Sequence, residues 1–367
     1  MNNKEYFKKF NSSKAKVLAS LVSNGPSSRK NLADELHLTR AFLTKLTTRM
    51  LEEKLILTGP EMNEGKVGRK QVMLKVNNAK GYFLGVHIAV DHISVRCSDL
   101  ALNIVAFKRF EFSQLSDECI DEVLEYIKGQ CECHNVHNFL KISLLVRGSV
   151  LDNKALDIQV QDVKAKFESK LNQEVYLINN IVALSSSLDF SSKTGSNYIL
   201  VKYGPGVGSL VISNSSILLR ANGRPVEIGH IQIDPSSPYK CEICHKNGCL
   251  ESEIGFSTLT KIASDGKSSS SDFSILEKYL EDGDDIMKEA LTKLTIFISE
   301  AYDIFEPNSV FLTGEPFVQE KYRNYVYKAI EENDLNIKNK LSFIYDYIDI
   351  SSRASIVYAF ERYLDTI

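Results

Sequence analysis

The first 76 residues alternate between amphipathic and apolar stretches in a pattern that predicts three helices and then two strands. Apolar residues recur every three or four positions in three segments, which predicts helices over 14–24, 29–37 and 40–54. Gly25 ends the first helix, Ser27 or Ser28 can cap the second, and Thr39 can cap the third. The apolar face expected for the third helix consists of Phe42, Leu43, Leu46, Met50 and Leu51.

Two apolar runs, 55–57 and 72–76, follow these helices and flank a glycine-rich basic loop, which predicts a hairpin. Two short helices, a turn, a longer helix and a hairpin make a winged helix-turn-helix, so we predict a DNA-binding domain over residues 1–77. The second helix of the helix-turn-helix, predicted over 40–54, is expected to enter the major groove. There the guanidinium of Arg40 matches a guanine edge. The predicted DNA-binding residues are Thr39, Arg40, Thr44, Lys45, Arg49, Lys66 and Arg69.

The charge distribution supports this prediction. Residues 1–75 contain 15 lysines and arginines against 7 aspartates and glutamates, whereas the remainder contains 29 against 40. A basic segment joined to an acidic body is typical of a protein whose basic part binds nucleic acid. Double-stranded DNA is therefore the expected partner of the N-terminal domain.

From residue 82 the pattern changes to apolar runs of strand length that alternate with amphipathic helices. Three strands, two helices with a strand between them, a further strand and a helix are expected over residues 82–190, and a second set of three strands starts near residue 196. We therefore predict an α/β body over residues 78–367. Its two halves are expected at residues 78–185 with the C-terminal helix, and at residues 186–350.

Length and composition limit the classes of protein to consider. A chain of 367 residues is expected to hold two or three domains. It has no apolar run long enough to cross a bilayer and no signal-like segment at the start. Seven cysteines, an odd number, favour reduced thiols and metal binding over a disulfide framework. We therefore expect a cytoplasmic protein without a membrane partner.

The segment 227–251, EIGHIQIDPSSPYKCEICHKNGCLE, carries four metal-ligand residues at close spacing. They are His230, Cys241, Cys244 and Cys249. Three thiolates and one imidazole form a closed four-coordinate set typical of structural zinc, with no position open for catalysis. The alternative is a group of unrelated buried thiols. A second run, CECHNVH at 131–137, also contains ligand types, but its place at a helix end does not favour a metal.

This segment resembles the ROK family of sugar kinases and repressors. The family pattern is Glu-x-Gly-His followed by CxCGxxGCxE, and the matching residues here are Glu227, Gly229, His230, Gly248, Cys249 and Glu251. The chain departs from the pattern in having CxxC in place of CxC, and His245 where glycine is usual. The resemblance implies an actin-like ATPase body with a ligand between its two halves, attached here to the winged helix-turn-helix.

The resemblance also implies which residues hold a sugar. The matching positions are Asn179, Asn180, Glu227, His230 and Glu251. Carboxylates that accept hydrogen bonds from vicinal hydroxyls suit a sugar, and an amide can both donate and accept. Alternatively, Glu227 and Glu251 only support the zinc loop.

Two parts that phosphoryl transfer needs in the kinase relatives are missing. The kinases have a DxGGT turn after the first strand, whereas this chain reads Val86-His87-Ile88-Ala89-Val90-Asp91, so the aspartate and both glycines are missing. They also have an Asn-Asp pair whose aspartate takes the proton of the attacking hydroxyl, whereas this chain has Asn180 at the aspartate position. A glycine-rich segment at 204–208 remains, but such a segment alone is a weak nucleotide signal. No catalytic residue is therefore predicted.

Three hypotheses follow. The first is a transcriptional regulator, most simply a repressor of carbohydrate-utilisation genes, in which an inactive kinase-like body senses a sugar. In the second, the body has lost sugar binding and serves dimerisation only. The third is a residual sugar kinase with a DNA-binding appendage. For the first two we expect a homodimer or a tetramer on a palindromic operator, because two-fold symmetry in the protein is mirrored in the DNA.

Overall fold

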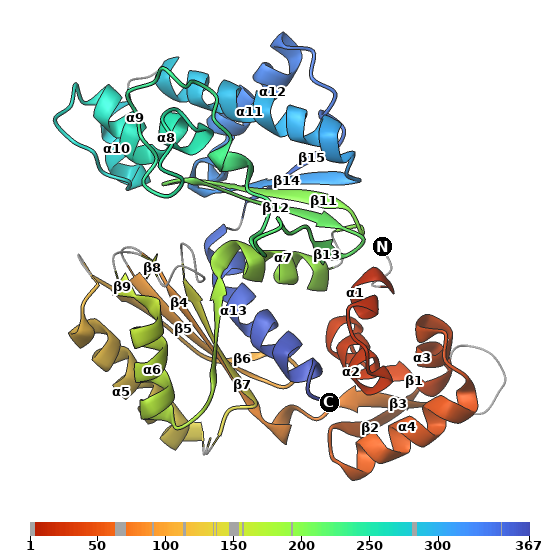
Figure 1. The fold of residues 1–367 in the computed structure, drawn as a ribbon. Helices are drawn as coiled ribbons and strands as arrows, with labels where there is room; N and C mark the ends of the chain where they lie inside the picture. Colours follow the sequence, from red (N-terminus) through yellow and green to blue (C-terminus); the bar gives the residue numbers. More distant parts are fainter. Residues whose placement is uncertain are drawn as a thin grey trace. The chain divides into compact units, whose positions relative to one another are not determined.

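The computed structural model describes residues 4–62, 71–89, 92–112, 115–134, 136, 138–146, 154–155, 158–191, 194–280, 285–345 and 347–367. The chain forms two compact units (Figure 1). Unit 1 consists of Met1–Lys193 with Ile348–Ile367, and unit 2 of Thr194–Tyr347. Among the residues that the structure describes, no helix is both long and apolar enough to cross a membrane.

Unit 1 begins with a small domain of helices and a three-stranded sheet in the order β1-β3-β2, which we call the head. Its elements are α1 (Lys4–Lys8), α2 (Ser13–Asn24), β1 (Ser27–Ser28), α3 (Arg29–Leu36), α4 (Arg40–Glu52), β2 (Ile56–Met62) and β3 (Gln71–Val76). Ser28 caps α3 by accepting a hydrogen bond from the Asn31 amide at 3.2 Å, and Thr39 caps α4 through the Phe42 amide at 3.3 Å. The predicted three helices and hairpin are confirmed.

One core prediction in the head is wrong. Phe42 does not face the core: its side chain is 47% exposed. The buried positions of α4 are Leu43, Thr47 and Met50, and a residue next to a buried one on a helix points about 100° away from it. Thr47 is buried because its hydroxyl is bonded on both sides, accepting from Arg29 Nε at 2.8 Å and donating to the Leu43 carbonyl at 2.9 Å.

The rest of unit 1 is built on a five-stranded sheet in the order β10-β7-β4-β5-β6. Strands β4, β5 and β6 form an antiparallel meander, and β7 and β10 continue the sheet in parallel. The elements are η1 (Asn78–Lys80), β4 (Tyr82–Ile88), β5 (His92–Asp99), β6 (Ile104–Glu111), α5 (Asp117–His134), β7 (Lys141–Val146), β8 (Lys154–Ala155), β9 (Ile158–Gln159), α6 (Val160–Leu171), β10 (Val175–Asn179), α7 (Asn180–Phe190) and α13 (Tyr347–Leu364).

Strand β4 shows how this sheet buries both faces. Leu84, Val86 and Ile88 share one apolar cluster with residues of α5 and α6. Phe83 points the other way and joins a cluster that contains residues of α13 and of the head. Successive side chains of a strand alternate between faces, so a strand covered on both sides is apolar throughout.

Unit 2 contains a second five-stranded sheet, in the order β13-β12-β11-β14-β15. A three-strand antiparallel meander is again extended by two parallel strands, so both sheets have the same connectivity. Its elements are β11 (Tyr198–Tyr203), β12 (Val207–Ser213), β13 (Ser216–Ile217), η2 (Ile228–His230), α8 (Leu250–Ile254), α9 (Phe256–Ala263), α10 (Phe273–Tyr279), α11 (Asp285–Phe305), β14 (Ser309–Thr313), η3 (Glu315–Val318), α12 (Glu320–Glu332) and β15 (Leu341–Ile344). The predicted body of two α/β halves is confirmed.

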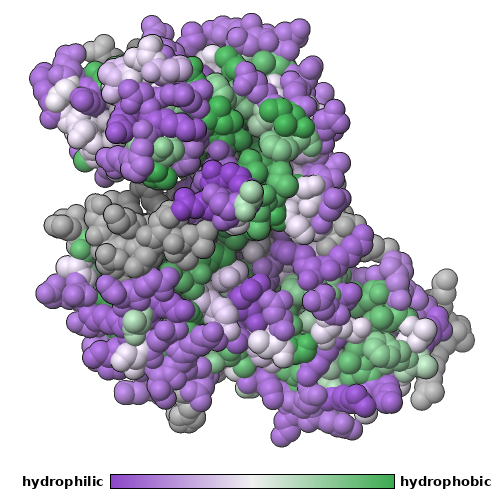
Figure 2. All heavy atoms as spheres, in the orientation of Figure 1, coloured by the Kyte–Doolittle hydropathy of each residue, from purple (hydrophilic) through white to green (hydrophobic). Residues whose placement is uncertain are grey.

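Several elements were not predicted. These are α1, β1, β8, β9, α8, α9, α10, α12 and β15. Most of them are too short to show a repeating apolar pattern. The exception is α12, whose buried residues Tyr322, Val326, Ala329 and Ile330 recur at helical spacing in the sequence. Figure 2 shows that the solvent side of α9 and α10 is mostly hydrophilic, as expected for helices with one buried face.

Candidate functional site

The cysteine-rich loop lies between η2 and α8 and folds on itself through backbone hydrogen bonds. The amides of Ile233 and Asp234 both donate to the Gly248 carbonyl, at 2.7 and 3.0 Å, and the Cys241 amide donates to the Lys246 carbonyl at 2.9 Å. Gly248 has φ +58°, and a Cβ there would collide with the Asp234 carbonyl. Glycine is therefore required at this position.

His245 stands where the family pattern has glycine, and its backbone adopts a conformation typical of glycine. Its backbone has φ +60°, in the left-handed region that glycine adopts freely. The histidine accepts this conformation because the turn is closed by the bond from its amide to the Cys241 carbonyl at 3.0 Å. The extra residue between Cys241 and Cys244 thus leaves the loop able to close.

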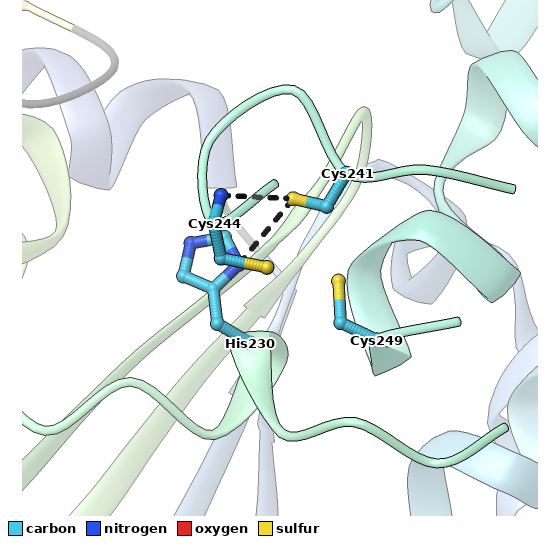
Figure 3. A group of neighbouring side chains, drawn as sticks. All are labelled: His230, Cys241, Cys244 and Cys249. Atoms are coloured by element: carbon cyan, nitrogen blue, oxygen red, sulfur yellow. Dashed lines mark hydrogen bonds between the residues drawn. The ribbon is translucent and has the colours of Figure 1, made fainter. Parts of the chain in front are cut away.

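The loop brings His230, Cys241, Cys244 and Cys249 together (Figure 3). Their ligand atoms all lie within 4.8 Å of one another. In a tetrahedral zinc site with bonds of about 2.3 Å to sulfur, two sulfurs lie roughly 3.8 Å apart, so a small contraction would close the cluster around an ion. The group can therefore hold a metal ion.

The cluster's environment also suits a metal. Cys241 and Cys249 are buried. The pKa of the Cys241 thiol is raised to about 12, mainly by burial and to a smaller extent by the nearby Glu251 and Cys249, while backbone hydrogen bonds act in the opposite direction. A bound cation reverses this because it stabilises the thiolate. In the residues that the structure describes, no other group of this kind occurs, and Cys131 and Cys133 near the end of α5 belong to none.

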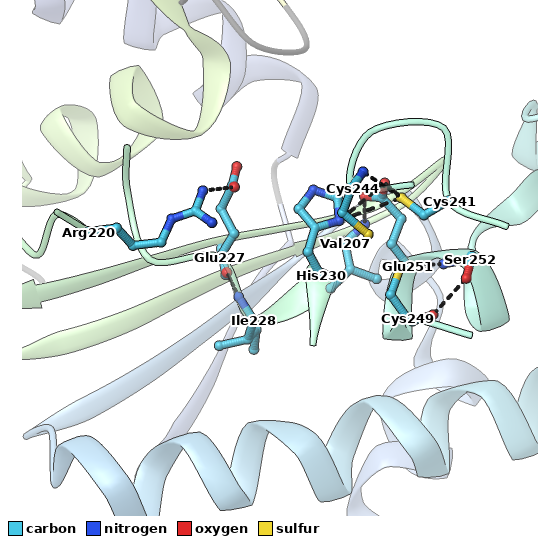
Figure 4. A network of polar contacts seen from close by, with 11 residues as sticks. Val207, Arg220, Glu227, Ile228, His230, Cys241, Cys244, Cys249, Glu251 and Ser252 are labelled. Carbon is cyan, nitrogen blue, oxygen red and sulfur yellow. Dashed lines mark hydrogen bonds and ion pairs between the residues drawn. The ribbon is translucent and has the colours of Figure 1, made fainter. Parts of the chain in front are cut away.

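Glu251 connects the metal cluster to the glycine-rich turn between β11 and β12 (Figure 4). Its Oε2 accepts a hydrogen bond from the Val207 amide at 2.9 Å. Its Oε1 lies 3.8 Å from Cys241 Sγ and 4.0 Å from His230 Nδ1. A Cβ at Gly206 would meet this carboxylate, so the absence of a side chain there lets the turn approach it. Glu251 is therefore a structural link as well as a candidate sugar ligand.

Glu227 also has a partner in the structure. Its Oε2 accepts from Arg220 Nη2 at 2.9 Å, and both side chains are exposed. No role was predicted for Arg220, which lies seven positions before Glu227 in the sequence. Such exposed pairs contribute only about 0–1 kcal/mol, so a ligand can displace the arginine at little cost.

The two asparagines expected at the sugar site lie in unit 1, whereas Glu227, His230 and Glu251 lie in unit 2. Asn179 is the last residue of β10 and caps α7, because its Oδ1 accepts from the Ile181 amide at 2.9 Å. Asn180 is the first residue of α7 and is half-buried. Within unit 2, Figure 4 shows the side chains of Glu227 and Glu251 on opposite sides of His230.

The kinases have their phosphate turn between the strands that correspond to β4 and β5, and in this chain Val90 and Asp91 of that segment lie outside the described residues. The Ala89 amide donates to the His92 carbonyl at 2.9 Å. His87 is buried, and its ring packs edge-on against that of His92 with 5.8 Å between centroids. His87 and His92 thus flank the segment where the family turn has its two glycines, and those two positions are Ala89 and Val90 in this chain.

The head exposes most of the residues expected to contact DNA. Thr39, Arg40, Thr44, Lys45 and Arg49 all lie on the exposed side of α4 or at its cap. Phe42, which was predicted to face the core, lies among these exposed residues. Lys66 and Arg69 lie outside the described residues.

Comparison with known proteins agrees with this arrangement. A model of the ROK family matches residues 83–344. The xylose repressor of Bacillus spizizenii is 26% identical over 250 residues, which cover 64% of this chain and 63% of the repressor's length.

Two solved structures show the same fold at low identity. A ROK family transcriptional regulator, a homolog of the E. coli Mlc protein, has a TM-score of 0.72 at 18% identity and covers 95% of this chain and 96% of its own. A ROK family glucokinase from Streptomyces griseus, in complex with glucose and AMPPNP, has a TM-score of 0.60 at 17% identity and covers 77% of this chain and 100% of its own. Since the family model spans most of the chain, this protein belongs to the ROK family.

Proposed function

We propose that this chain is a DNA-binding transcriptional repressor of carbohydrate-utilisation genes, whose kinase-like body senses a sugar and does not transfer phosphate. The observation that carries the proposal is the union of a basic helix-turn-helix head with a ROK body that lacks the phosphate turn and the catalytic base. The name of the Bacillus xylose repressor supports both the repression and the sugar.

We assign the two proposed functions to two successive parts of the chain. Residues 1–77 bind an operator through α4 and the following hairpin, with Lys66 and Arg69 as further contacts. Residues 78–367 bind the effector and form a homodimer or a tetramer. We also propose a cytoplasmic location, because the proposed operator DNA lies inside the cell.

Zinc is the metal that the cluster in unit 2 suits best. Three cysteines and one histidine are soft ligands, and their set is complete without water, which is typical of structural zinc. The ion would tie the loop between η2 and α8 and fix the direction of Glu251. The proposed sugar ligands are Asn179, Asn180, Glu227, His230 and Glu251.

A second candidate function is a repressor whose body has lost its effector and serves dimerisation. The observation in its favour is that both carboxylates of the proposed sugar site already have partners, Val207 for Glu251 and Arg220 for Glu227. A thermal-shift panel of xylose, glucose, N-acetylglucosamine and their phosphates distinguishes the two. A sugar that raises the melting temperature supports sensing, and a panel without response supports dimerisation only.

The DNA interface can be tested with duplexes selected from a random pool by the wild-type protein. Arg40→Ala should weaken binding by about 1–3 kcal/mol and relax the preference at one base pair. Phe42→Ala should weaken a neighbouring preference for thymine, because an exposed aromatic ring can contact the thymine methyl group. Quantitative gel-shift titrations on the selected duplex and its single-base variants measure both effects.

The matched control for these variants is Lys128→Ala, which removes an exposed cation from α5 in the body, where its partner is Glu125. It should bind as the wild type does. If Arg40→Ala loses the same binding affinity on every base-pair variant, Arg40 contacts only phosphates. If the wild-type protein selects no duplex at all, the proposed function is wrong.

Kinase activity should be absent. We expect no ATP consumption above background with xylose, glucose or N-acetylglucosamine, because Asn180 cannot take up a proton at neutral pH. Asn180→Asp alone should not create activity, since the β4–β5 connection still lacks the phosphate turn. A coupled assay with a ROK glucokinase as positive control measures this, and turnover by the unmodified protein would contradict the proposal.

A further inference from the structure

A buried ion cluster lies where the start of the head packs on the body within unit 1. Lys9, directly after α1, places its Nζ 2.9 Å from Asp189 Oδ2 and 3.3 Å from Glu361 Oε1. The side chains are 24%, 13% and 6% exposed, respectively. One residue of the head thus bridges two helices of the body, because Asp189 belongs to α7 and Glu361 to α13.

Aromatic side chains from the same elements surround this cluster. The ring of Tyr6 in α1 packs edge-on against Phe190 at the end of α7, with 5.7 Å between centroids. Phe190 packs in turn against Phe360 of α13 at 6.3 Å. Lys9 Nζ lies 5.5 Å from the centroid of the Tyr6 ring. The ion cluster and the apolar contact therefore fix one position of α1 on the ends of α7 and α13.

The charged state of Lys9 depends on the two carboxylates that surround it, Glu361 and Asp189. Burial by itself would lower the pKa of Lys9, but Glu361 and Asp189 outweigh it and raise that pKa above its usual value, so the lysine is charged. Its removal would leave two carboxylates facing each other in a largely dry site. A buried charge that loses its partner is strongly unfavourable, so the head would have to move to admit water.

Helices α7 and α13, which Lys9 bridges, lie next to the two points where the chain passes between the units. Helix α7 begins at Asn179 and Asn180, two of the proposed sugar ligands, and ends at Phe190, shortly before the chain leaves unit 1 after Lys193. Helix α13 begins at Tyr347, the last residue of unit 2, and the chain returns to unit 1 at Ile348. Lys9 therefore holds the head to the two helices that carry the chain into and out of unit 2.

Helix α7 is suited to transmit a displacement along its length. It has 11 residues, of which Ile181, Ala183, Leu184, Ser185, Ser186 and Leu188 are buried. At about 1.5 Å per residue its ends lie roughly 16 Å apart, and a packed helix moves as a rigid element. A ligand that shifts the Asn179 end therefore also shifts Asp189 at the other end.

We propose that Lys9 is the positioning residue that couples the DNA-binding head to the effector-binding body, through its bridge to Asp189 in α7 and Glu361 in α13. This inference rests on the proposed function, since it assumes that the head binds DNA and the body a sugar. Linkage requires that the coupling be reciprocal, so DNA bound to the head must also affect α7.

The first experiment uses the free full-length protein and hydrogen–deuterium exchange. Lys9→Met should accelerate exchange by about tenfold or more in α1 and in the last turns of α7 and α13, because the contact opens more often. Lys9→Arg should stay close to the wild type, since a guanidinium can bond both carboxylates. The matched control is Lys14→Met, a lysine of the same 24% exposure whose partner Glu53 lies within the head.

The second experiment adds the duplex selected by the wild-type protein. DNA should change exchange in Asn180–Phe190 in the wild type, Lys9→Arg and Lys14→Met, and leave it unchanged in Lys9→Met. Because Lys9→Met leaves buried carboxylates and can fail to fold, the variant Lys9→Met/Asp189→Asn/Glu361→Gln is measured beside it. This variant keeps the side-chain shapes without unpaired charge, and it should also fail to transmit.

The outcomes separate this inference from the proposed function. If Lys9→Met or the triple variant transmits the effect of DNA to α7 as Lys14→Met does, Lys9 is not the coupling residue. The same conclusion follows if DNA protects the head of the wild type and leaves α7 unchanged. If the wild type selects no duplex, the proposed function fails and the coupling with it, while exchange in the free protein still decides whether Lys9 holds the head.

Discussion

Cys249→Ser should abolish zinc binding and lower the free energy of unfolding of unit 2 by on the order of 3–5 kcal/mol. Cys249 is fully buried, and its Sγ accepts the Ser252 amide at 3.4 Å where α8 begins. Loss of the thiolate therefore removes a metal ligand and weakens the helix start that follows it. Metal analysis by mass spectrometry should find about one zinc per wild-type chain and none in the variant.

Thermal unfolding with and without a chelator measures the stability effect. The matched control is Cys133→Ser, which removes an exposed thiol at the end of α5 in unit 1, outside the cluster. It should keep both the zinc and the melting temperature of the wild type. Wild-type protein that is purified without chelators and contains no zinc would contradict the proposed metal site.

The second large effect is expected at Glu251, where the structure separates two roles of one carboxylate. Glu251→Ala removes the acceptor of the Val207 amide, and leaving such a group unsatisfied costs about 1–3 kcal/mol. Glu251→Gln keeps an oxygen for that amide but loses the charge next to His230. We therefore expect the alanine variant to lose stability and the sugar response, and the glutamine variant to lose mainly the response.

The measurement is a titration of the selected duplex with and without the sugar that raises the melting temperature of the wild type. The sugar-induced change in affinity should fall at least about tenfold in Glu251→Gln, or about 1.4 kcal/mol. Glu253→Gln is the control, because Glu253 also lies in α8 and accepts a hydrogen bond from Ser237, away from the cluster. A normal response in Glu251→Gln would mean that the sugar site lies elsewhere.

Much of the fold was predictable because its signals are local. The helices of the head and both antiparallel meanders follow from apolar periodicity and caps over windows of about ten residues. The antiparallel part of each sheet follows once the strands are assigned, since consecutive strands usually pair. The pairing of β7 with β4 and of β14 with β11 was not predicted, and neither was β15. Short helices such as α8 (Leu250–Ile254) were missed, because five residues span little more than one helical turn and cannot show a repeating apolar pattern.

The metal cluster was predictable for the same reason. Its ligands lie within 20 positions of each other, and a loop this short keeps them close in most folds. The surroundings were not predictable. Val207 is 44 positions from Glu251, and nothing in the spacing indicates that the glycine-rich turn donates its amide to that carboxylate. The orientation of Phe42 also depended on how α4 packs on α3.

The sequence by itself determined the family, the order of most of the longer helices and strands, the basic head and the four clustered ligands, because these depend on residue type and short spacing. Only the tertiary structure decided that Lys9 meets Glu361, 352 positions away, and that Asp189 joins them at the end of the helix that Asn179 caps. Such contacts depend on the packing of sheets and helices that are distant in the chain, and no local pattern encodes them.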